Sequence, residues 1–228
     1  MEALDVLANN LANAGTPGFK ADREFYSTYV SAEAALGTGT DPVLPVVQRN
    51  WTDFSQGALT PTSNPFDIAV NGSGFLKVAG PSGPLYIRSG TLQISKAGEL
   101  ATAEGYTVPG TDGKPIHLDA SLPMEIAPDG SVRQDGQTVG QIALLDFGDK
   151  SAIRKHGNNY FQIDRADLQP QPAAGSFAQG NLEAANFQTA ESAVRLVSVL
   201  RQFETLQRAV RVGSEMDKQL IEDVAKPA

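Results

Sequence analysis

The residue types that most often carry chemistry are scarce in this chain, and their spacing suggests no reaction. Its two histidines, His117 in "PIHLD" and His156 in "RKHGN", have neither a second histidine nor a carboxylate at metal-ligand spacing. Cysteine is absent, which excludes disulfides, thiol catalysis and cysteine-ligated metals. We therefore interpret His117 as a strand residue and His156 as a turn residue, both with structural roles.

Glycine-containing patterns that could bind phosphate or calcium are better explained as turns. The segment "NGSGF" has a lone Gly-x-Gly, and neither a Walker loop nor a Gly-x-Ser-x-Gly nucleophile elbow occurs. The Asp-Gly pairs at 112, 129 and 135 are not followed by the twelve-residue ligand pattern of a calcium loop. The sequence thus predicts no cofactor, no metal and no enzymatic activity. Only a concave site with perturbed titratable groups would support an enzymatic function.

Composition limits the partners that the chain can have. With 228 residues, of which 41% are hydrophobic, it can bury a core in one or two domains. The net charge of -8 and the lack of a basic block argue against nucleic acid. No run of apolar residues is long enough to predict a transmembrane segment. The N-terminus lacks the features of a cleaved signal peptide. We expect a cytoplasmic protein or one exported without a cleaved signal.

The first element that the sequence predicts is a short N-terminal helix. Apolar residues recur there at steps of 3, 4 and 3, the spacing of one helix face, at Leu4, Leu7, Leu11 and Ala14. The helix should end at "GTPG", where glycine suits a left-handed cap and proline cannot continue the helix. Asn9, Asn10 and Asn13 either fix the register where helices meet, or are solvated and cap the helix end.

The middle of the chain changes from an irregular pattern to a β pattern. Residues 31–65 are rich in Gly, Thr, Ser and Pro and are predicted to form an extended linker, which Trp51 and Phe54 anchor to a surface. From residue 66, short runs such as "FDIAV", "FLKVA", "LYIRS" and "MEIA" alternate with glycine turns, as in a β-sandwich or barrel. We place a β-rich domain at 66–168 and a second linker at 169–180.

The C-terminal segment, 181–228, is predicted to contain a long helix, and residues 1–30 the N-terminal helix and its exit turn. Apolar residues occupy a and d positions of one heptad register at Leu196, Val199, Phe203, Leu206, Val210, Leu220 and Val224. A lone helix cannot bury this seam, so it needs the N-terminal helix, other copies of the chain, or both. The alternative is that it folds back on the β domain.

Four motifs, in order along the chain, resemble those of the bacterial flagellar rod, hook and basal-body proteins. The first three are "LDVLANNLANAGTPGFKADREFY", "NPFDIAVNGSGFLKV" and "YIRSGTLQISKAGELATAEGYTV". The fourth is "QGNLEAANFQTAESAVRLVSVLRQFETLQRAV", with Gly180, Leu182, Glu183, Asn186, Arg201, Phe203 and Glu204. The four motifs cover most of the chain and are specific as a set.

This resemblance implies a fold and a function. Members of the family have terminal helices that pair as a coiled-coil-like inner domain, D0, and a β-rich outer domain, D1. The implied fold is mainly β with terminal α-helices. The implied function is that of a structural axial subunit of the flagellar basal-body rod, which polymerises helically into a hollow drive shaft and transmits torque. The modest length and "DGQTVGQIALLDFGD" resemble F-type proximal rod proteins more than G-type distal ones.

The resemblance also implies partners, a location and site residues. The partners would be copies of the chain, other rod and hook axial proteins, and the flagellar type III export apparatus. The location would be the periplasmic rod, reached without a cleaved signal. The expected assembly interface comprises Leu4, Leu7, Asn9, Asn10, Leu11, Asn13, Leu182, Glu183, Asn186, Leu196, Val199, Phe203, Leu206, Val210, Leu220 and Val224. The expected turn and structural residues are Gly18, Phe19, Gly72, Gly74, Phe75, Gly90, Gly98 and Gly105.

The chain departs from the family pattern in two places. Family members usually have helical residues before the motif that starts here at residue 4, so we expect roughly twenty more residues of the same period upstream. Leu76 and Ile87 stand where the family often has an aromatic residue and a threonine.

An alternative function is a carbohydrate- or surface-binding β module with a coiled-coil oligomerisation tail. A cluster of aromatic side chains on one face of the β domain would favour this alternative. The candidates for such a cluster are scattered along the sequence, at Tyr86, Tyr106, Tyr160 and Phe161.

Overall fold

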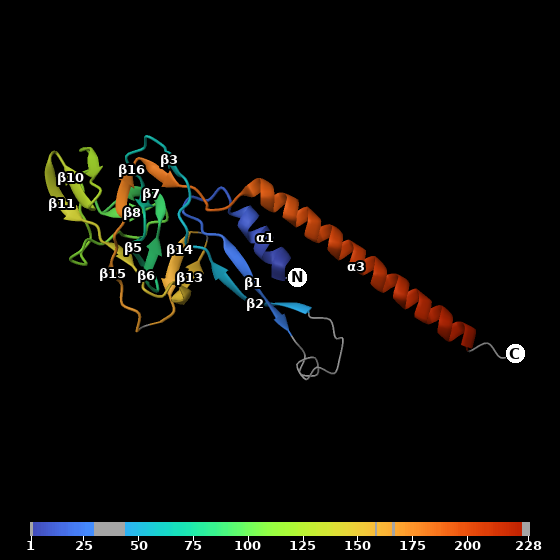
Figure 1. The fold of residues 1–228 in the computed structure, drawn as a ribbon. Coiled ribbons are helices and arrows are strands. Elements are labelled where there is room, and N and C mark those ends of the chain that lie inside the picture. Colours follow the sequence, from blue (N-terminus) through green and yellow to red (C-terminus); the bar gives the residue numbers. More distant parts are fainter. Residues whose placement is uncertain (1, 30–43, 158, 166, 225–228) are drawn as a thin grey trace. The chain divides into compact units, whose positions relative to one another are not determined.

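The computed structural model describes residues 2–29, 44–157, 159–165 and 167–224 (Figure 1). The chain divides into two compact units. The helical unit combines Met1–Ala12 with Gln188–Ala228, and the β unit comprises Asn13–Phe187. The chain is mainly β with one helix near each end, which confirms the coarse fold class expected from the sequence.

The helical unit contains two helices of very different length. Helix α1 (Glu2–Ala12) has 11 residues and helix α3 (Thr189–Val224) has 36, which correspond to about 16 and 54 Å. The two helices contact each other. Because α1 is so short, it can cover only about a third of the length of α3. Neither helix, within the described part of the chain, has the length and apolarity needed to cross a bilayer.

The β unit is built from antiparallel strand pairs. Its strands are β1 (Asp22–Tyr29), β2 (Leu44–Thr52), β3 (Leu59–Pro61), β4 (Asp67–Asn71), β5 (Phe75–Gly80), β6 (Gly83–Ile87), β7 (Ser89–Ile94), β8 (Leu100–Thr102), β9 (Met124–Ile126), β10 (Ser131–Gln134), β11 (Gln137–Gln141), β12 (Leu144–Asp146), β13 (Ile153–His156), β14 (Tyr160–Ile163), β15 (Gln171–Pro172), β16 (Ser176–Gln179) and β17 (Asn181–Glu183). A short 3-10 helix, η1 (Lys150–Ala152), precedes β13.

Two sheets form the body of this unit. One has the strand order β13-β14-β6-β5-β12-β15, and the other has the order β16-β4-β7-β8. Smaller sheets pair β1 with β2 and β17 with β3, and a three-stranded sheet has the order β11-β10-β9. Ile68 of β4, Leu76 of β5, Ile87 of β6 and Leu92 of β7 belong to one buried apolar core that draws on both large sheets.

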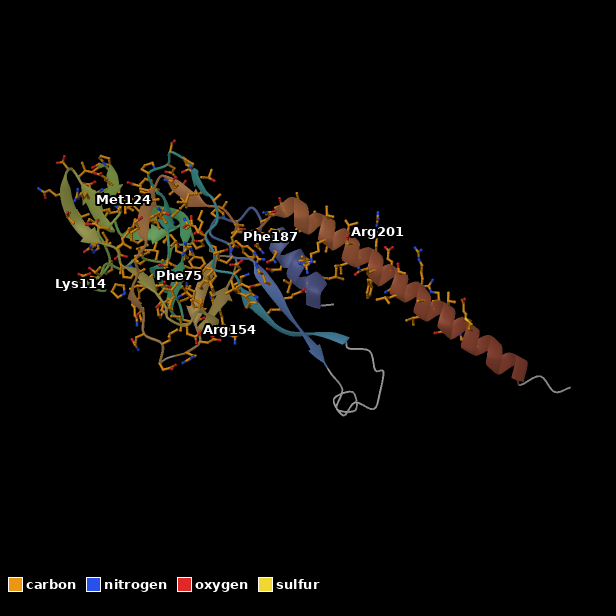
Figure 2. The ribbon with its side chains drawn as sticks, in the orientation of Figure 1. Phe75, Lys114, Met124, Arg154, Phe187 and Arg201 are labelled. Carbon is orange, nitrogen blue, oxygen red and sulfur yellow. The ribbon has the colours of Figure 1, made fainter. Side chains whose placement is uncertain are left out.

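The six-stranded sheet is also buried on its second face, by an aromatic core. Because side chains alternate along a strand, Phe75 lies on the face opposite Leu76 and joins Tyr86, Phe147 and Phe161. The ring centroids of Phe75 and Phe161 are 5.6 Å apart in an edge-to-face arrangement, a geometry that aromatic pairs prefer. Figure 2 shows Phe75 in the interior of the β unit, whereas the side chain of Arg201 projects from α3.

Segments expected to be linkers contain strands. The range 31–65 includes β2 and β3, and the range 169–180 includes β15 and β16; residues 30–43 lie outside the described residues. The strands form because distant partners supply their hydrogen bonds, β1 to β2 and β4 to β16, which local composition does not reveal. The β unit therefore extends well beyond the expected range of 66–168.

The structure confirms one predicted anchor and several predicted turns. Phe54 packs on the aromatic core, 5.3 Å from the ring centroid of Phe161, whereas Trp51 is 48% exposed. The glycines of the expected turns adopt positive φ angles at Gly72, Gly74, Gly98, Gly113, Gly130 and Gly136. The local sequence thus predicted the turns between strands correctly.

Candidate functional site: the buried Glu183 cluster and the α3 surface

Glu183, the last residue of β17, is the centre of a buried charge cluster. Its Oε1 accepts a hydrogen bond from Nζ of Lys20 at 2.6 Å, and its Oε2 accepts one from Nε of Arg88 at 3.0 Å. The backbone N–H of Gly57 also donates to Oε1, at 2.8 Å. The side chains of Lys20 and Glu183 are fully buried, and that of Arg88 is 3% exposed. We call Lys20, Arg88 and Glu183 the Glu183 cluster.

The turn between β4 and β5 surrounds the guanidinium of Arg88. Arg88 donates to the carbonyl oxygens of Gly72 at 2.7 Å, Gly74 at 2.8 Å and Val70 at 3.4 Å. The planar guanidinium carries five N–H donors, so it can serve these carbonyls and Glu183 together. The segment "NGSGF" therefore encloses a side chain of its own chain, which supports its interpretation as a structural turn.

Backbone groups bring the chain segments of the cluster into close contact. The N–H of Gly18 donates to the carbonyl of Glu183 at 2.7 Å, and the N–H of Glu183 donates to Oγ of Ser89 at 2.8 Å. Gly57 lies so close to the next residue of that segment that a Cβ atom there would be 1.9 Å from the carbonyl oxygen of Ala184. The cluster thus depends on a glycine for a backbone approach as well as on charge.

Asn186 links the segment that follows α1 to the segment around Asp53 through side-chain hydrogen bonds. Its Oδ1 accepts a hydrogen bond from the N–H of Ala21 at 2.8 Å, and its Nδ2 donates to the carbonyl of Asp53 at 2.7 Å. The N–H of Asp53 donates in turn to the carbonyl of Ala21 at 2.9 Å. Three segments that are distant in sequence are therefore joined by one amide side chain.

The carboxylate of Asp53 is also held in its charged form. Its Oδ2 accepts from Nε of Arg23 at 2.7 Å, and its Oδ1 accepts from the N–H of Ser55 at 2.9 Å. Burial acts to raise the pKa of Asp53, but the hydrogen bonds from Ser55 and Arg23 outweigh it and hold the pKa below its usual value.

Phe19, expected to be structural, is buried beside a second ion pair. Nζ of Lys155 lies 4.2 Å from the centroid of the Phe19 ring and 2.7 Å from Oδ2 of Asp22. A cation over an aromatic face at this distance is attracted by the ring. Burial lowers the pKa of Lys155, and Asp22 opposes this effect. The segment that follows α1 is therefore held at two adjacent residues, by the contact of Phe19 with Lys155 and by the ion pair of Lys20 with Glu183.

The chemistry of the Glu183 cluster is that of a structural ion-pair network. Burial lowers the pKa of the Lys20 ammonium, and the charge of Glu183 opposes that shift. Nζ of Lys20 also donates to the carbonyl of Ser55 at 2.7 Å. A fully buried carboxylate whose two oxygens accept hydrogen bonds from the protein has no access to a substrate. We conclude that the cluster holds chain segments together.

The expected helix residues differ in their exposure. Leu7 and Asn10 are buried, Leu4, Leu11, Asn13, Leu196 and Val199 are half-buried, and Asn9 is exposed. None of the three asparagines is without a partner. Large apolar side chains of α3 are exposed at Val194, Val197, Leu200, Phe203, Leu206, Val210, Val212 and Met216. The side chains of Leu220 and Val224 lie outside the described residues.

The remaining expected residues belong to the β unit. Leu182 and Asn186 are half-buried and Glu183 is fully buried, and all three belong to the β unit, whereas the exposed residues above belong to α3. Gly90 lies within β7, where it pairs with Ile68 of β4, and Gly105 follows β8 with a positive φ angle. Sequence reasoning missed Lys20 and Arg88. Arg88 could have been noticed as a charged residue in the otherwise apolar strand run "LYIRS".

The structure places the aromatic candidates for a carbohydrate site inside the protein. Tyr86, Tyr160 and Phe161 are 4%, 7% and 1% exposed. The ring of half-buried Tyr106 packs edge-to-face on Tyr160, with centroids 5.3 Å apart. These four side chains belong to the cores or pack against them and do not form an exposed stacking surface. His117 and His156 are both exposed.

Profiles of known protein families match three parts of the chain. The flagella basal body rod protein profile matches residues 2–20, the flagellar hook protein FlgE/F/G D1 domain matches 69–138, and the flagellar basal body rod FlgEFG protein C-terminal region matches 178–223. The flagellar basal-body rod protein FlgF of Caulobacter vibrioides is 33% identical to this chain, over 98% of this chain and 92% of its own length. The chain belongs to the family of flagellar basal-body rod proteins.

Further relatives come from both branches of this rod protein family. The flagellar basal-body rod protein FlgF of Mesorhizobium japonicum is 33% identical over 91% of this chain and 86% of its own length. The flagellar basal-body rod protein FlgG of Buchnera aphidicola is 30% identical over 95% of this chain and 92% of its own length. The resemblance expected from the four motifs is thus confirmed, and the chain is a structural protein of the flagellar basal body.

The Glu183 cluster connects the three regions that define the rod protein family in this chain. Lys20 lies in the N-terminal profile, Arg88 in the D1 profile and Glu183 in the C-terminal profile. The three matched regions are far apart in sequence, yet one carboxylate contacts a cation from each of the other two.

Proposed function

We propose that this chain is an axial subunit that polymerises helically through its terminal helices into a hollow rod, which transmits torque. The observation that carries the proposal is the apolar surface of α3. Leu206 and Val210, at successive seam positions, are 65% and 69% exposed. Burying each such side chain contributes about 1.5–3 kcal/mol. Packing of this surface against helices of neighbouring copies is therefore strongly favourable.

Other features support the same proposal. Contact between α1 and α3 supports their pairing as a coiled-coil-like D0 domain, with the residues of these two helices that were expected above at the assembly interface. The Caulobacter and Mesorhizobium FlgF relatives support a place in the proximal rod, rather than the distal rod. We further propose that the chain acts without enzymatic activity, contacts other axial proteins, and reaches the periplasm through the flagellar type III export apparatus without a cleaved signal.

The substitution Leu206→Lys tests this function. It places a charge within the proposed helix interface, where burial without a partner costs several kcal/mol in every copy. The free monomer should stay soluble, and its β unit should melt as in the wild type because Leu206 lies outside that unit. Cells that carry only this variant should lack complete rods and should not swim.

A matched control is Thr205→Lys, which adds the same charge to the adjacent exposed position outside the seam. This variant should assemble rods and swim normally. Hydrogen exchange of the free monomer should show weak protection of residues 196–216. Normal swimming of the Leu206→Lys strain, or strong protection of that segment in the monomer, would contradict the assembly role of α3.

A further inference from the structure

We propose that the Glu183 cluster makes two chain segments fold as one: residues 13–21, which follow α1, and residues 181–187, which precede α3. Neither segment reaches its native structure unless the other is in place. The proposal concerns the isolated chain and does not depend on rod assembly. It assigns to Lys20 and Glu183 the role of positioning residues at the start of both connections to the terminal helices.

Charge is the first reason for this mutual dependence. Lys20 and Glu183 are fully buried and 2.6 Å apart. If residues 181–187 are displaced, Lys20 keeps the carbonyl of Ser55 but loses the carboxylate of Glu183. If residues 13–21 are displaced, Glu183 loses the ammonium of Lys20 and keeps Arg88 and the N–H of Gly57 as partners. A buried cation without its counter-charge is strongly unfavourable, so residues 13–21 would leave the interior with residues 181–187. In the other direction the carboxylate loses one of its two ion pairs.

Backbone hydrogen bonds are the second reason. The N–H of Gly18 donates to the carbonyl of Glu183 at 2.7 Å, and the N–H of Ala21 donates to Oδ1 of Asn186 at 2.8 Å. If residues 181–187 were displaced, both N–H groups would lose their acceptors, and if residues 13–21 were displaced, the carbonyl of Glu183 and Oδ1 of Asn186 would lose these donors. A buried backbone group without a partner is unfavourable, so the hydrogen bonds reinforce the effect of the ion pair.

The position of Glu183 in the sequence gives this dependence a direction. Glu183 comes 163 positions after Lys20. In a chain that emerges with its N-terminus first, residues 13–21 therefore become available long before residues 181–187. The segment after α1 therefore stays unstructured until residues 181–187 are available. The cluster thereby couples the last step of folding in the β unit to the arrival of the C-terminal segment.

Hydrogen exchange of the full chain with the substitution Glu183→Gln tests the proposal. The glutamine keeps the shape, but its single amide oxygen cannot replace both carboxylate oxygens, and its NH₂ group would face a donor. Exchange should rise in residues 18–21 as well as in residues 181–187, by a similar factor on the order of 100-fold. Amides of β5 should keep higher protection. The exposed control Glu125→Gln should leave all of these segments unchanged.

A second variant keeps the proposal testable if Glu183→Gln does not fold. The substitution Lys20→Met should increase exchange in residues 181–187, although the substituted position lies in the other segment. In the double variant the loss of protection should be at least about 10-fold smaller than the product of the two single effects, because the same interaction is removed twice. Increased exchange confined to the substituted segment, or independent effects of the two substitutions, would overturn the proposal.

Discussion

Nζ of Lys20 lies 2.6 Å from Oε1 of Glu183, and both side chains are fully buried. Well-packed apolar residues could often replace a buried ion pair without loss of stability, whereas removing one partner is strongly destabilising. Lys20 is paired with its counter-charge only when the segment after α1 meets the segment before α3, where Arg88 is the second partner of the carboxylate.

The contact at Gly57 predicts that Gly57→Ala is destabilising. A Cβ atom would lie 1.9 Å from the carbonyl oxygen of Ala184, and the backbone there cannot move away easily because the N–H of Ala184 donates to the carbonyl of Ala58 at 2.8 Å. We expect a loss of about 1–3 kcal/mol, measured as a lower midpoint in urea. The control Gly148→Ala meets no atom within 4 Å and should change stability by less than about 0.5 kcal/mol. Equal midpoints for the two variants would contradict this account of the cluster.

The lowered pKa of Asp53 leads us to expect that the free energy of unfolding decreases in acid. Its pKa is below the ordinary value in the folded state, so between the two values the unfolded chain binds more protons. The stabilisation by Asp53 is therefore complete above its ordinary pKa of 3.8 and is lost as the pH falls through the lower folded value.

The substitution Asp53→Asn isolates this contribution. At pH 7 it should reduce the free energy of unfolding by about 1 kcal/mol, since Arg23 is largely exposed and the Asn side chain can still accept from Ser55. Urea titrations followed by the fluorescence of Trp51, the single tryptophan, should show this difference shrinking as the pH falls below 3.8. A difference that stays constant down to pH values where both proteins are protonated would argue against a perturbed Asp53.

Local sequence patterns predicted the helices, the strands β4 to β7 and the glycine turns because each depends on short-range periodicity or backbone conformation. They did not predict β1, β2, β3, β15 and β16, because these strands depend on partners far along the chain. The Glu183 cluster was missed for the same reason. Neither Lys20 nor Arg88 has a local feature that shows its partner, and only the fold brings both to Glu183.

The extent of the β unit predicts which fragment folds alone. A fragment of residues 66–165, the strand-rich region by sequence, lacks Phe54 of the aromatic core and Phe177 of the main core. It also lacks β16, which pairs with β4, and the carboxylate that faces Arg88. We expect this fragment to show a broad melt without cooperativity, because unpaired strand edges and a buried unpaired cation are unfavourable.

A fragment of residues 13–187 contains all of these groups and should melt cooperatively, with the circular dichroism of a β protein. Adding Glu183→Gln to this longer fragment should lower its melting temperature by several degrees, because a loss of about 3 kcal/mol shifts a domain of this size by roughly 2–4 °C per kcal/mol. The control Glu125→Gln, at an exposed position of β9, should leave the melt unchanged. If the 66–165 fragment instead melts as sharply as 13–187, the segments around Glu183 would be additions to a core that is already complete, and the cluster would not be part of the folding unit.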